Sequence, residues 1–331
     1  MKIGKIDLSQ IECRLLNTVA GQWDIIKKFK VGTDIYSELA SQFYGFKVDK
    51  SMPKERGTGK QLELSCGYGA GSMTIIRTAR AGTYGPPITL SGDQGRAARD
   101  LYRRTHPQVV KLWKTGERFL DVLFVGNYEP WPECPAVEAH NHRLFFRPSG
   151  LWLDFTTLRR TVENRIDIYH TIDQWLRKQN AEITKEKTWA ELRTQLANVK
   201  AASDLDTTYK KTLHNYGVTE EMLKDWIESL PAKQSTWHHQ VRDGWRKTYG
   251  ARLVENLIQF LARMVISERM VAISRLGLKV PLTVHDDVFI LVPDDRTDLW
   301  DQAVKIMEAP LSWLPECPIA CEAKLLDALD E

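Results

Sequence analysis

The segment Lys279–Pro293, KVPLTVHDDVFILVP, decides how we expect the chain to fold. Two apolar runs, Val280–Val284 and Val288–Val292, are rich in β-branched and aromatic residues, which is typical of strands. Only His285-Asp286-Asp287 separates them, so the sequence predicts a hairpin with a tight turn of charged residues. Adjacent carboxylates at the tip of an apolar strand pair are costly unless a cation offsets them, and a divalent ion is the usual partner. The alternative is a surface hairpin whose acidic turn is simply solvated.

Another carboxylate follows an apolar run near the start of the chain. Residues 2–6, KIGKI, are predicted to form a short strand, and Asp7 stands at its end. Ser9 and Glu12 have the spacing of a capping box, which predicts a helix that closes at Gly21. Asp7 would then lie where a strand passes into a helix, a common place for a functional carboxylate. An ordinary turn residue would give the same pattern.

A third segment combines positive charge with an aromatic residue. If the chain is helical here, Arg56 and Lys60 lie one turn apart, and Leu64 and Tyr68 follow on nearly the same face. Two cations and an aromatic ring suit a triphosphate with a base behind it. The alternative is a solvated Arg/Lys pair, but like charges at this spacing repel unless an anion lies between them.

These segments resemble the motifs of one enzyme family. The sequence Asp7–Arg14, DLSQIECR, is similar to motif A of the family A DNA polymerases, the bacterial DNA polymerase I type and its phage relatives. The spacing R-x3-K-x7-Y-G from Arg56 to Gly69 resembles motif B, and VHDD at Val284–Asp287 resembles motif C. The motifs occur in the family's order, and the resemblance covers nearly the whole chain apart from one long insertion.

The resemblance implies an α+β, right-hand polymerase fold with an antiparallel palm sheet, helical fingers and no thumb. We expect palm segments at 1–22 and 237–331, fingers at 23–140 and a palm connection at 141–155. Residues 156–236 predict a helical insertion, because Leu158 and Val162 begin an apolar stripe at helical spacing and the family usually has far fewer residues here.

The resemblance also implies a template-directed DNA polymerase that transfers a nucleotide from a dNTP to a primer 3′-hydroxyl by a two-metal mechanism. Asp7 and Asp286 would hold two Mg²⁺ ions, for which Mn²⁺ could substitute, and the backbone carbonyl of Leu8 would be a further ligand. Asp287 is expected to assist catalysis, either as a ligand or as a helper, although it stands where the family has Glu.

Two groups of residues would contact the substrates. The residues expected to bind the nucleotide are Glu12, Tyr36, Arg56, Lys60, Leu64 and Tyr68. Among them, Glu12 would exclude a 2′-hydroxyl, and Tyr36 could hydrogen-bond a phosphate where many relatives have His. The residues expected to contact primer–template DNA are Gln259, Asn256 and His285, the first two on a long helix predicted over Arg252–Met270.

Charge is distributed unevenly along the chain. Between residues 71 and 120 there are nine Lys/Arg against three acids, and between 286 and 331 twelve acids against three bases. This pattern suits a protein that holds a polyanion on one side and cations on the other, although solvated helix faces would look similar. Within the basic segment, a helix is predicted to begin at Ser91 and to break at His106-Pro107.

Composition indicates an ordinary globular chain. It has 331 residues, of which 43% are hydrophobic and 27% charged, with no run of transmembrane length and no signal peptide. The five cysteines lack zinc-site spacing and are interpreted as reduced thiols. We therefore expect no membrane association and a cytoplasmic location, which would be the host cytoplasm if a phage encodes the chain.

Two other functions remain open. One is a relative of the single-subunit RNA polymerases, which share the palm; Glu12 argues against it, because those enzymes must admit the 2′-hydroxyl. The other is a non-catalytic, DNA-binding subunit of polymerase-like fold. The presence of Asp7, Asp286, Arg56 and Lys60 argues against the second.

The start of the chain predicts a partner. In the resembled family the thumb and the proofreading exonuclease precede motif A, whereas only residues 1–6 precede Asp7 here. We therefore expect a truncated chain or one half of a split polymerase, with a second polypeptide supplying the thumb and also the exonuclease. Because an open sheet edge invites pairing, this partner is expected to dock along the Lys2–Ile6 strand and the helical insertion.

Overall fold

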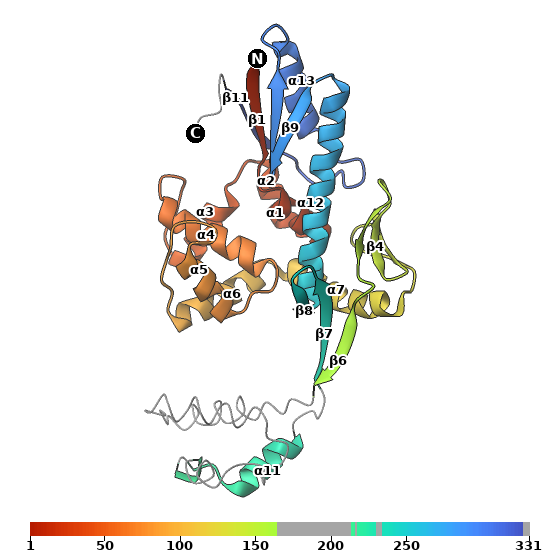
Figure 1. Ribbon diagram of the computed structural model, residues 1–331. Coiled ribbons are helices and arrows are strands. Elements are labelled where there is room, and N and C mark those ends of the chain that lie inside the picture. Colours follow the sequence, from red (N-terminus) through yellow and green to blue (C-terminus); the bar gives the residue numbers. More distant parts are fainter. Residues whose placement is uncertain (164–212, 216, 230–233, 327–331) are drawn as a thin grey trace. The chain divides into compact units, whose positions relative to one another are not determined.

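The structure is a computed structural model, and it describes residues 1–163, 213–215, 217–229 and 234–326 (Figure 1). The chain forms two compact units, which are described separately. The first comprises residues 1–158 and 248–331, and the second comprises residues 159–247. None of the helices in the described ranges combines the length and the apolar character needed to cross a bilayer.

The first unit contains a four-stranded antiparallel sheet in the order β11-β1-β10-β9. Its strands are β1 (Lys2–Leu8), β9 (Lys279–Val284), β10 (Asp287–Val292) and β11 (Cys321–Leu326). The predicted hairpin is present as β9 and β10, joined by His285 and Asp286. His285 has a φ of 55°, so the turn reaches the left-handed region without a glycine.

The position of β1 corrects the expected docking edge. Ile3 is the register partner of Leu291 on β10 and also of Leu326 on β11, so β1 is an inner strand. Its backbone N–H and C=O groups are already used on both sides, which leaves no open edge for another chain. The expectation of a partner along Lys2–Ile6 is therefore wrong.

One face of this sheet is buried and the other is open. Ile6, Leu8, Val288 and Ile290 are fully buried, on the side where α12 (Gly250–Arg275) and α13 (Thr297–Glu308) contact the sheet (Figure 1). Because side chains alternate along a strand, Lys5 and Asp7 project from the opposite face of β1. The alternation that builds the core thus places Asp7 where a ligand can reach it.

The helix after β1 begins differently from the prediction. It runs over Ile11–Ala20 and closes at Gly21, as expected, but Gln10 is the residue before its first turn and no side chain caps it. The Ser9 capping box is therefore wrong. The backbone N–H of Ser9 instead donates to the carbonyl of Ala320, 3.0 Å away, which continues the pairing of β1 one residue beyond the strand.

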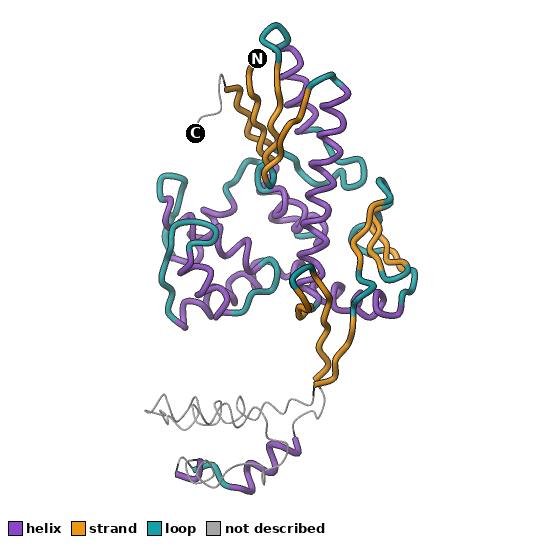
Figure 2. Tube along the Cα trace, in the orientation of Figure 1, coloured by secondary structure: helices purple, strands orange, loops and turns teal. Residues whose placement is uncertain are grey.

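A group of short helices follows, shown in purple in Figure 2. They are α1 (Ile11–Ala20), α2 (Trp23–Lys30), α3 (Ile35–Tyr44), α4 (Pro53–Cys66), α5 (Ser72–Ala81) and α6 (Gly92–Thr105). Helices α3 and α4 approach closely at Gly59, where a Cβ atom would lie 1.9 Å from the carbonyl oxygen of Tyr36. Only glycine fits there, and the close approach brings the motif B residues beside Tyr36.

The predicted break between two helices is also present. Ser91 and Gln94 form a capping box at the start of α6, and α7 (Pro107–Val125) begins at the proline. Helix α7 crosses α12 at two glycines, since a Cβ on Gly116 would lie 2.3 Å from the carbonyl oxygen of Gly250. The Glu117 carboxylate accepts a hydrogen bond of 2.6 Å from the Gly250 N–H and so caps α12.

A second sheet of the first unit has the order β2-β3-β4-β5. Its strands are β2 (Glu129–Pro130), β3 (Val137–His140), β4 (Arg143–Phe146) and β5 (Leu151–Asp154). The β3–β4 hairpin lies across the boundary at residue 140 that the sequence suggested. The assignment of these segments to palm and fingers stays a prediction.

The second unit contains strands where helices were expected. Strands β6 (Arg159–Glu163), β7 (Gln234–Val241) and β8 (Gly244–Thr248) pair in that order, and the unit also contains helix α11 (Glu220–Ser229). The expectation of a wholly helical insertion is wrong at both ends, because the apolar spacing of Leu158 and Val162 also fits a strand that begins at Arg159. The central part of the predicted insertion lies outside the described residues.

Candidate active site

A cleft of about 590 Å³ in the first unit gathers most of the predicted site residues. It lies among β1, α1, α3, α4, α12, the β9–β10 turn and β11. The predicted residues that line it are Asp7, Glu12, Tyr36, Arg56, Lys60, Leu64, Tyr68, Gln259, His285 and Asp286. Three distant parts of the sequence therefore meet in one place, although the role of each residue stays a prediction.

Carboxylates converge at the sheet end of the cleft. Asp7 is the register partner of Asp287 on β10 and of Glu322 on β11. The N–H of Leu8 donates to the carbonyl of Asp286 at 3.2 Å, which ties the turn to β1. Burial, together with the negative charges of Asp286, Asp287 and Glu322, raises the pKa of Asp7. A cation in the cleft would relieve this repulsion.

Asp287 lies outside the cleft, and Glu322 lies in it instead. Asp287 does not line the cleft, and its Oδ2 forms an ion pair of 3.0 Å with Nζ of Lys5. Glu322, which sequence reasoning missed, does line it. Its only signal in the sequence is a single acid in the last short strand.

The donor set fits magnesium. Carboxylate oxygens from Asp7 and Asp286 are the ligands that Mg²⁺ prefers, and Mg²⁺ commonly takes one or two carboxylates together with substrate phosphates and water. Within the described ranges, no three His, Cys, Asp or Glu side chains form a complete metal site by themselves. A site completed by substrate oxygens agrees with that finding. The expected contribution of the Leu8 carbonyl stays a prediction.

The opposite wall of the cleft is basic. Arg56 donates from Nε to Oδ2 of Asp34 at 2.6 Å and from Nη2 to Oδ1 at 3.2 Å, and its guanidinium lies 5.4 Å from the centroid of the Tyr36 ring. Although burial opposes it, the bond from Arg56 lowers the pKa of the Asp34 carboxyl. Lys60, one turn further along α4, has no recorded ion pair in the part of the chain that the structure describes. Of the two cations that α4 contributes to the cleft, Lys60 is thus the one more available to an anionic ligand.

Glu12 and Tyr68 connect α1 to the end of α4. The Tyr68 hydroxyl donates to Oε2 of Glu12 at 3.1 Å. Burial raises the pKa of Glu12 and of Tyr68, and the carboxylate of Glu12 raises that of the phenol further. A half-buried carboxylate held by a phenol forms a fixed boundary, suited to excluding a group from the space beside it.

One face of α12 forms the remaining wall. The residues that line the cleft from this helix recur about once per turn: Glu255, Gln259, the adjacent pair Ala262 and Arg263, and Ile266. Asn256, predicted with Gln259, does not line the cleft. Sequence reasoning missed Arg263, whose signal was its position one turn beyond Gln259, and Tyr84, which lies in a loop and gave no signal. Arg263 donates to the Thr283 hydroxyl on β9 at 3.4 Å.

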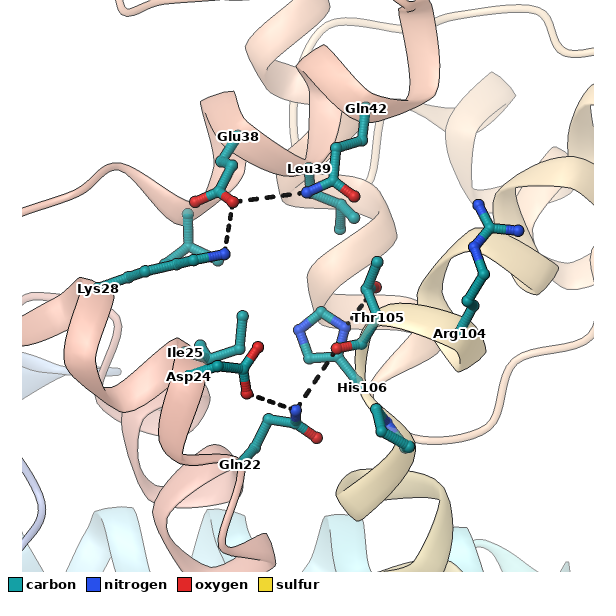
Figure 3. Close-up of a pocket in the computed structure, with 12 residues that line it drawn as sticks. Gln22, Asp24, Ile25, Lys28, Glu38, Leu39, Gln42, Arg104, Thr105 and His106 are labelled. Carbon is teal, nitrogen blue, oxygen red and sulfur yellow. Dashed lines mark hydrogen bonds and ion pairs between the residues drawn. The ribbon is translucent and has the colours of Figure 1, made fainter.

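A second cavity of the first unit, of about 410 Å³, contains none of the predicted site residues (Figure 3). It lies among α2, α3 and the α6–α7 junction. Its polar groups are largely paired with each other, since Lys28 forms an ion pair with Glu38, and Gln22 bonds to Asp24 at 2.6 Å. Of these two cavities, only the larger cleft brings predicted site residues together.

A protein-family model and a curated phage protein are both similar to this chain. Residues 1–119 match the family model described as DNA polymerase family A. Over 324 residues, the chain is 25% identical to a DNA polymerase of Bacillus phage SP02. The matched region covers 97% of this chain and 40% of the phage protein. The chain thus spans about 40% of the length of this curated relative.

A solved structure has a similar fold. It is described as the POL domain of Pol1 from M. smegmatis in complex with DNA primer-template and dNTP, with a TM-score of 0.52 and 14% identity over 99% of this chain and 40% of that one. This similarity confirms the expected α+β polymerase-domain fold. Together, the comparisons confirm the resemblance to family A.

Proposed function

We propose that this chain, whose first 119 residues match DNA polymerase family A, is a template-directed DNA polymerase that joins a dNTP to a primer 3′-hydroxyl. The observation that carries the proposal is the meeting of Asp7 and Asp286 with Arg56 and Lys60 across one cleft. Phosphoryl transfer depends on positioning and on stabilising charge, and this arrangement supplies groups of both signs.

Asp7 and Asp286 are the residues that would hold Mg²⁺. When bound, the metal ions would lower the pKa of the primer hydroxyl and neutralise the phosphates. Glu322, the cross-strand neighbour of Asp7, adds negative charge to the site. Asp287 forms an ion pair with Lys5 and does not line the cleft. This placement supports a helper role for Asp287 instead of a ligand role.

Arg56 and Lys60 would bind the triphosphate. Two bonds to Asp34 fix the orientation of the Arg56 guanidinium before substrate arrives, so little ordering remains to be done on binding. Lys60 is free to move toward the phosphates as negative charge grows on them. Tyr68 and Leu64 would contact the nascent base pair, and Tyr36 would lie behind the phosphates.

The α12 face would contact the primer–template. Gln259 and Arg263 are both exposed and lie one turn apart on the wall opposite α4. A neutral amide suits the acceptor groups of the minor groove, and a guanidinium suits a phosphate. His285 lies at the turn between the two walls. A second polypeptide that supplies a thumb stays a prediction. It cannot pair with β1 as first expected, because β1 is an inner strand.

Primer extension tests this function. Asp7→Ala and Asp286→Ala should each reduce single-turnover incorporation by roughly a thousandfold, since each removes a metal ligand worth several kcal/mol of transition-state stabilisation. DNA affinity, measured by fluorescence anisotropy, should change little. Asp295→Ala, which removes an exposed acid outside the cleft, is the matched control. Wild-type rates in either cleft variant would exclude the proposed mechanism.

The same assay separates the alternatives. A DNA polymerase extends with dNTPs, a relative of the single-subunit RNA polymerases extends with rNTPs, and a non-catalytic subunit extends with neither. The bond from Tyr68 to Glu12 favours the first, because it holds a carboxylate firmly in the cleft. Efficient extension with rNTPs would contradict the proposed exclusion of a 2′-hydroxyl by Glu12.

A further inference from the structure

The three-stranded sheet of the second unit concentrates positive charge. The described side chains at 159–161 and 236–248 include five cations, Arg159, Arg160, Arg242, Arg246 and Lys247, against one acid, Asp243. All five cations are exposed. We call this surface the basic sheet, and nothing in the proposed mechanism uses it.

One face of the basic sheet has a defined arrangement. The guanidinium carbon of Arg159 lies 3.6 Å from the centroid of the Trp245 ring, which is 44% exposed. Arg159 is the register partner of His238, so both project from the same face. Because residues two apart on a strand share a face, Lys247 projects on the same side as Trp245.

Hydrogen bonds also order this face. The Thr161 hydroxyl donates to the Thr236 carbonyl at 3.1 Å and lies 3.0 Å from Nδ1 of His238. Since that hydroxyl proton is already used, Nδ1 must carry a proton and donate to Thr161. This bond holds the His238 ring in one orientation on the face.

Most of the positive charge on the basic sheet is not neutralised. Asp243 lies 3.6 Å from Arg246, and both side chains are about 70% exposed, so this pair is weak. For Arg159, Arg242 and Lys247, no ion pair is recorded among the described residues. Three exposed cations without acidic partners in a small sheet favour a polyanionic ligand.

We propose that the basic sheet binds the phosphate backbone of duplex DNA, an inference that rests on the proposed polymerase function. Phosphate is favoured over a stacked base because Arg159 already covers a face of the Trp245 ring. A guanidinium held flat on a ring presents its N–H edge outward, where it can donate two hydrogen bonds to one phosphate. Duplex is favoured over single-stranded DNA because its charge density is higher.

The proposal is tested on the full chain with the triple variant Arg159→Gln/Arg242→Gln/Lys247→Gln. The matched control is Lys27→Gln/Lys30→Gln/Lys47→Gln, which removes three exposed positive charges from the first unit. Fluorescence anisotropy gives the affinity for a blunt duplex and for a single strand over a range of salt concentrations. Circular dichroism and thermal unfolding establish that both variants fold.

The triple variant should lose about tenfold or more in duplex affinity near 0.1 M salt. Each lost phosphate contact reduces the magnitude of the negative slope of log K against log salt by about 0.9, so three lost contacts reduce it by roughly 2 to 3. The control should keep both the affinity and the slope. An unchanged slope in the triple variant would overturn the proposal. Unchanged duplex binding with lost binding to poly-glutamate would also overturn it, and would assign the surface to an acidic polypeptide.

Primer extension distinguishes failure of this inference from failure of the proposed function. If the wild-type chain extends primers but the triple variant binds duplex normally, only the role of the basic sheet is excluded. If the chain does not extend primers while the triple variant still loses duplex binding and salt slope, only the polymerase function fails. We expect the triple variant to extend primers at the wild-type rate when DNA is saturating, but to need a higher DNA concentration to reach saturation.

Discussion

Of the two cations that α4 contributes to the cleft, Lys60 is the one more available to a phosphate. Arg56 is committed to Asp34 through two hydrogen bonds, whereas Lys60 faces the same cleft with no recorded ion pair within the described ranges. Two cations at i,i+4 spacing therefore have different tasks. Arg56 is held in place by Asp34, and in the proposed reaction Lys60 would follow the charge that develops on the phosphates.

Lys60→Ala should raise KM for the dNTP and also lower kcat, with a loss in kcat/KM of about a hundredfold. The reason is that Lys60 would meet more negative charge in the transition state than in the ground state. Steady-state kinetics on a primed template checks this. Lys54→Ala, on the exposed start of the same helix, should leave both constants unchanged. A change in KM alone would limit Lys60 to ground-state binding.

Asp7 should make the metal-free protein less stable at neutral pH. Burial and neighbouring carboxylates raise its pKa in the folded state, so its charged form is less favourable when folded than when unfolded. This cost is present at pH values above the raised pKa and disappears as the pH falls through it. Asp7→Asn should therefore raise the Tm of metal-free protein by a few degrees at neutral pH.

The pH dependence provides the check on that prediction. Thermal unfolding of metal-free wild type and Asp7→Asn should differ at neutral pH and converge in acid, where the wild-type carboxyl becomes protonated. Asp295→Asn, a change at an exposed acid, should give no such convergence. A wild type that is the more stable of the two at neutral pH would show that the repulsion is absent.

At the scale of elements, the crossing of α7 and α12 depends on two glycines. A Cβ on Gly116 would lie 2.3 Å from the Gly250 carbonyl oxygen, and one on Gly250 would lie 2.2 Å from that of Trp113. Real Cβ atoms do not approach backbone oxygens this closely, so the helices must separate to admit a methyl group. Helix α12 carries one wall of the cleft, which links this packing to function.

Gly116→Ala should destabilise the protein by about 1–3 kcal/mol, the usual range for overpacking a close contact. Urea denaturation measures the change. Gly71→Ala is a suitable control, because a Cβ there meets nothing within 4 Å, and it should stay within about 0.5 kcal/mol of wild type. Equal stability of the Gly116 variant would mean that the two helices do not pack this closely in solution.

The elements also show what the sequence could predict. The β9–β10 hairpin, the helix ending at Gly21 and the α6–α7 break carry local signals, namely β-branched runs, a C-terminal glycine and a proline, and all three predictions are confirmed. The start of the second unit was predicted to be helical but is strand β6. The prediction failed because two apolar residues four positions apart fit either a strand or a helix. The Ser9 capping box failed because pairing with the distant Ala320 segment overrode a local preference.

The sequence motifs predicted many of the residues that line the cleft. Ten predicted residues line the cleft, because helical spacing and strand alternation determine which side chains share a face. The place of Glu322 depends on pairing between β1 and β11, which no local pattern encodes. Asp287 was expected in the cleft, but its pairing with Lys5 becomes visible only once β1 and β10 are in register.

At the scale of the whole molecule, metal binding should be visible as stability. A ligand that binds only the folded state raises Tm with its concentration. Mg²⁺ should therefore raise the Tm of the wild type in differential scanning fluorimetry, and more strongly when DNA and nucleotide supply further oxygen ligands. Asp7→Asn/Asp286→Asn should show no such rise, and Ca²⁺ offers a second oxygen-seeking probe. An equal rise in the double variant would place the bound metal elsewhere.

The inner position of β1 also has a consequence for synthesis on the ribosome. Asp7 and its register partner Glu322 are separated by 315 residues (322 − 7), so the first strand emerges long before the neighbour that completes the sheet. At about 5–20 residues per second, it waits roughly a quarter of a minute to a minute. The helices after β1 make mostly local contacts and can form meanwhile, whereas a nascent β1 exposes both edges. A slow-translating host would lengthen that exposure, and chaperone capture of stalled nascent chains should concentrate on this first strand.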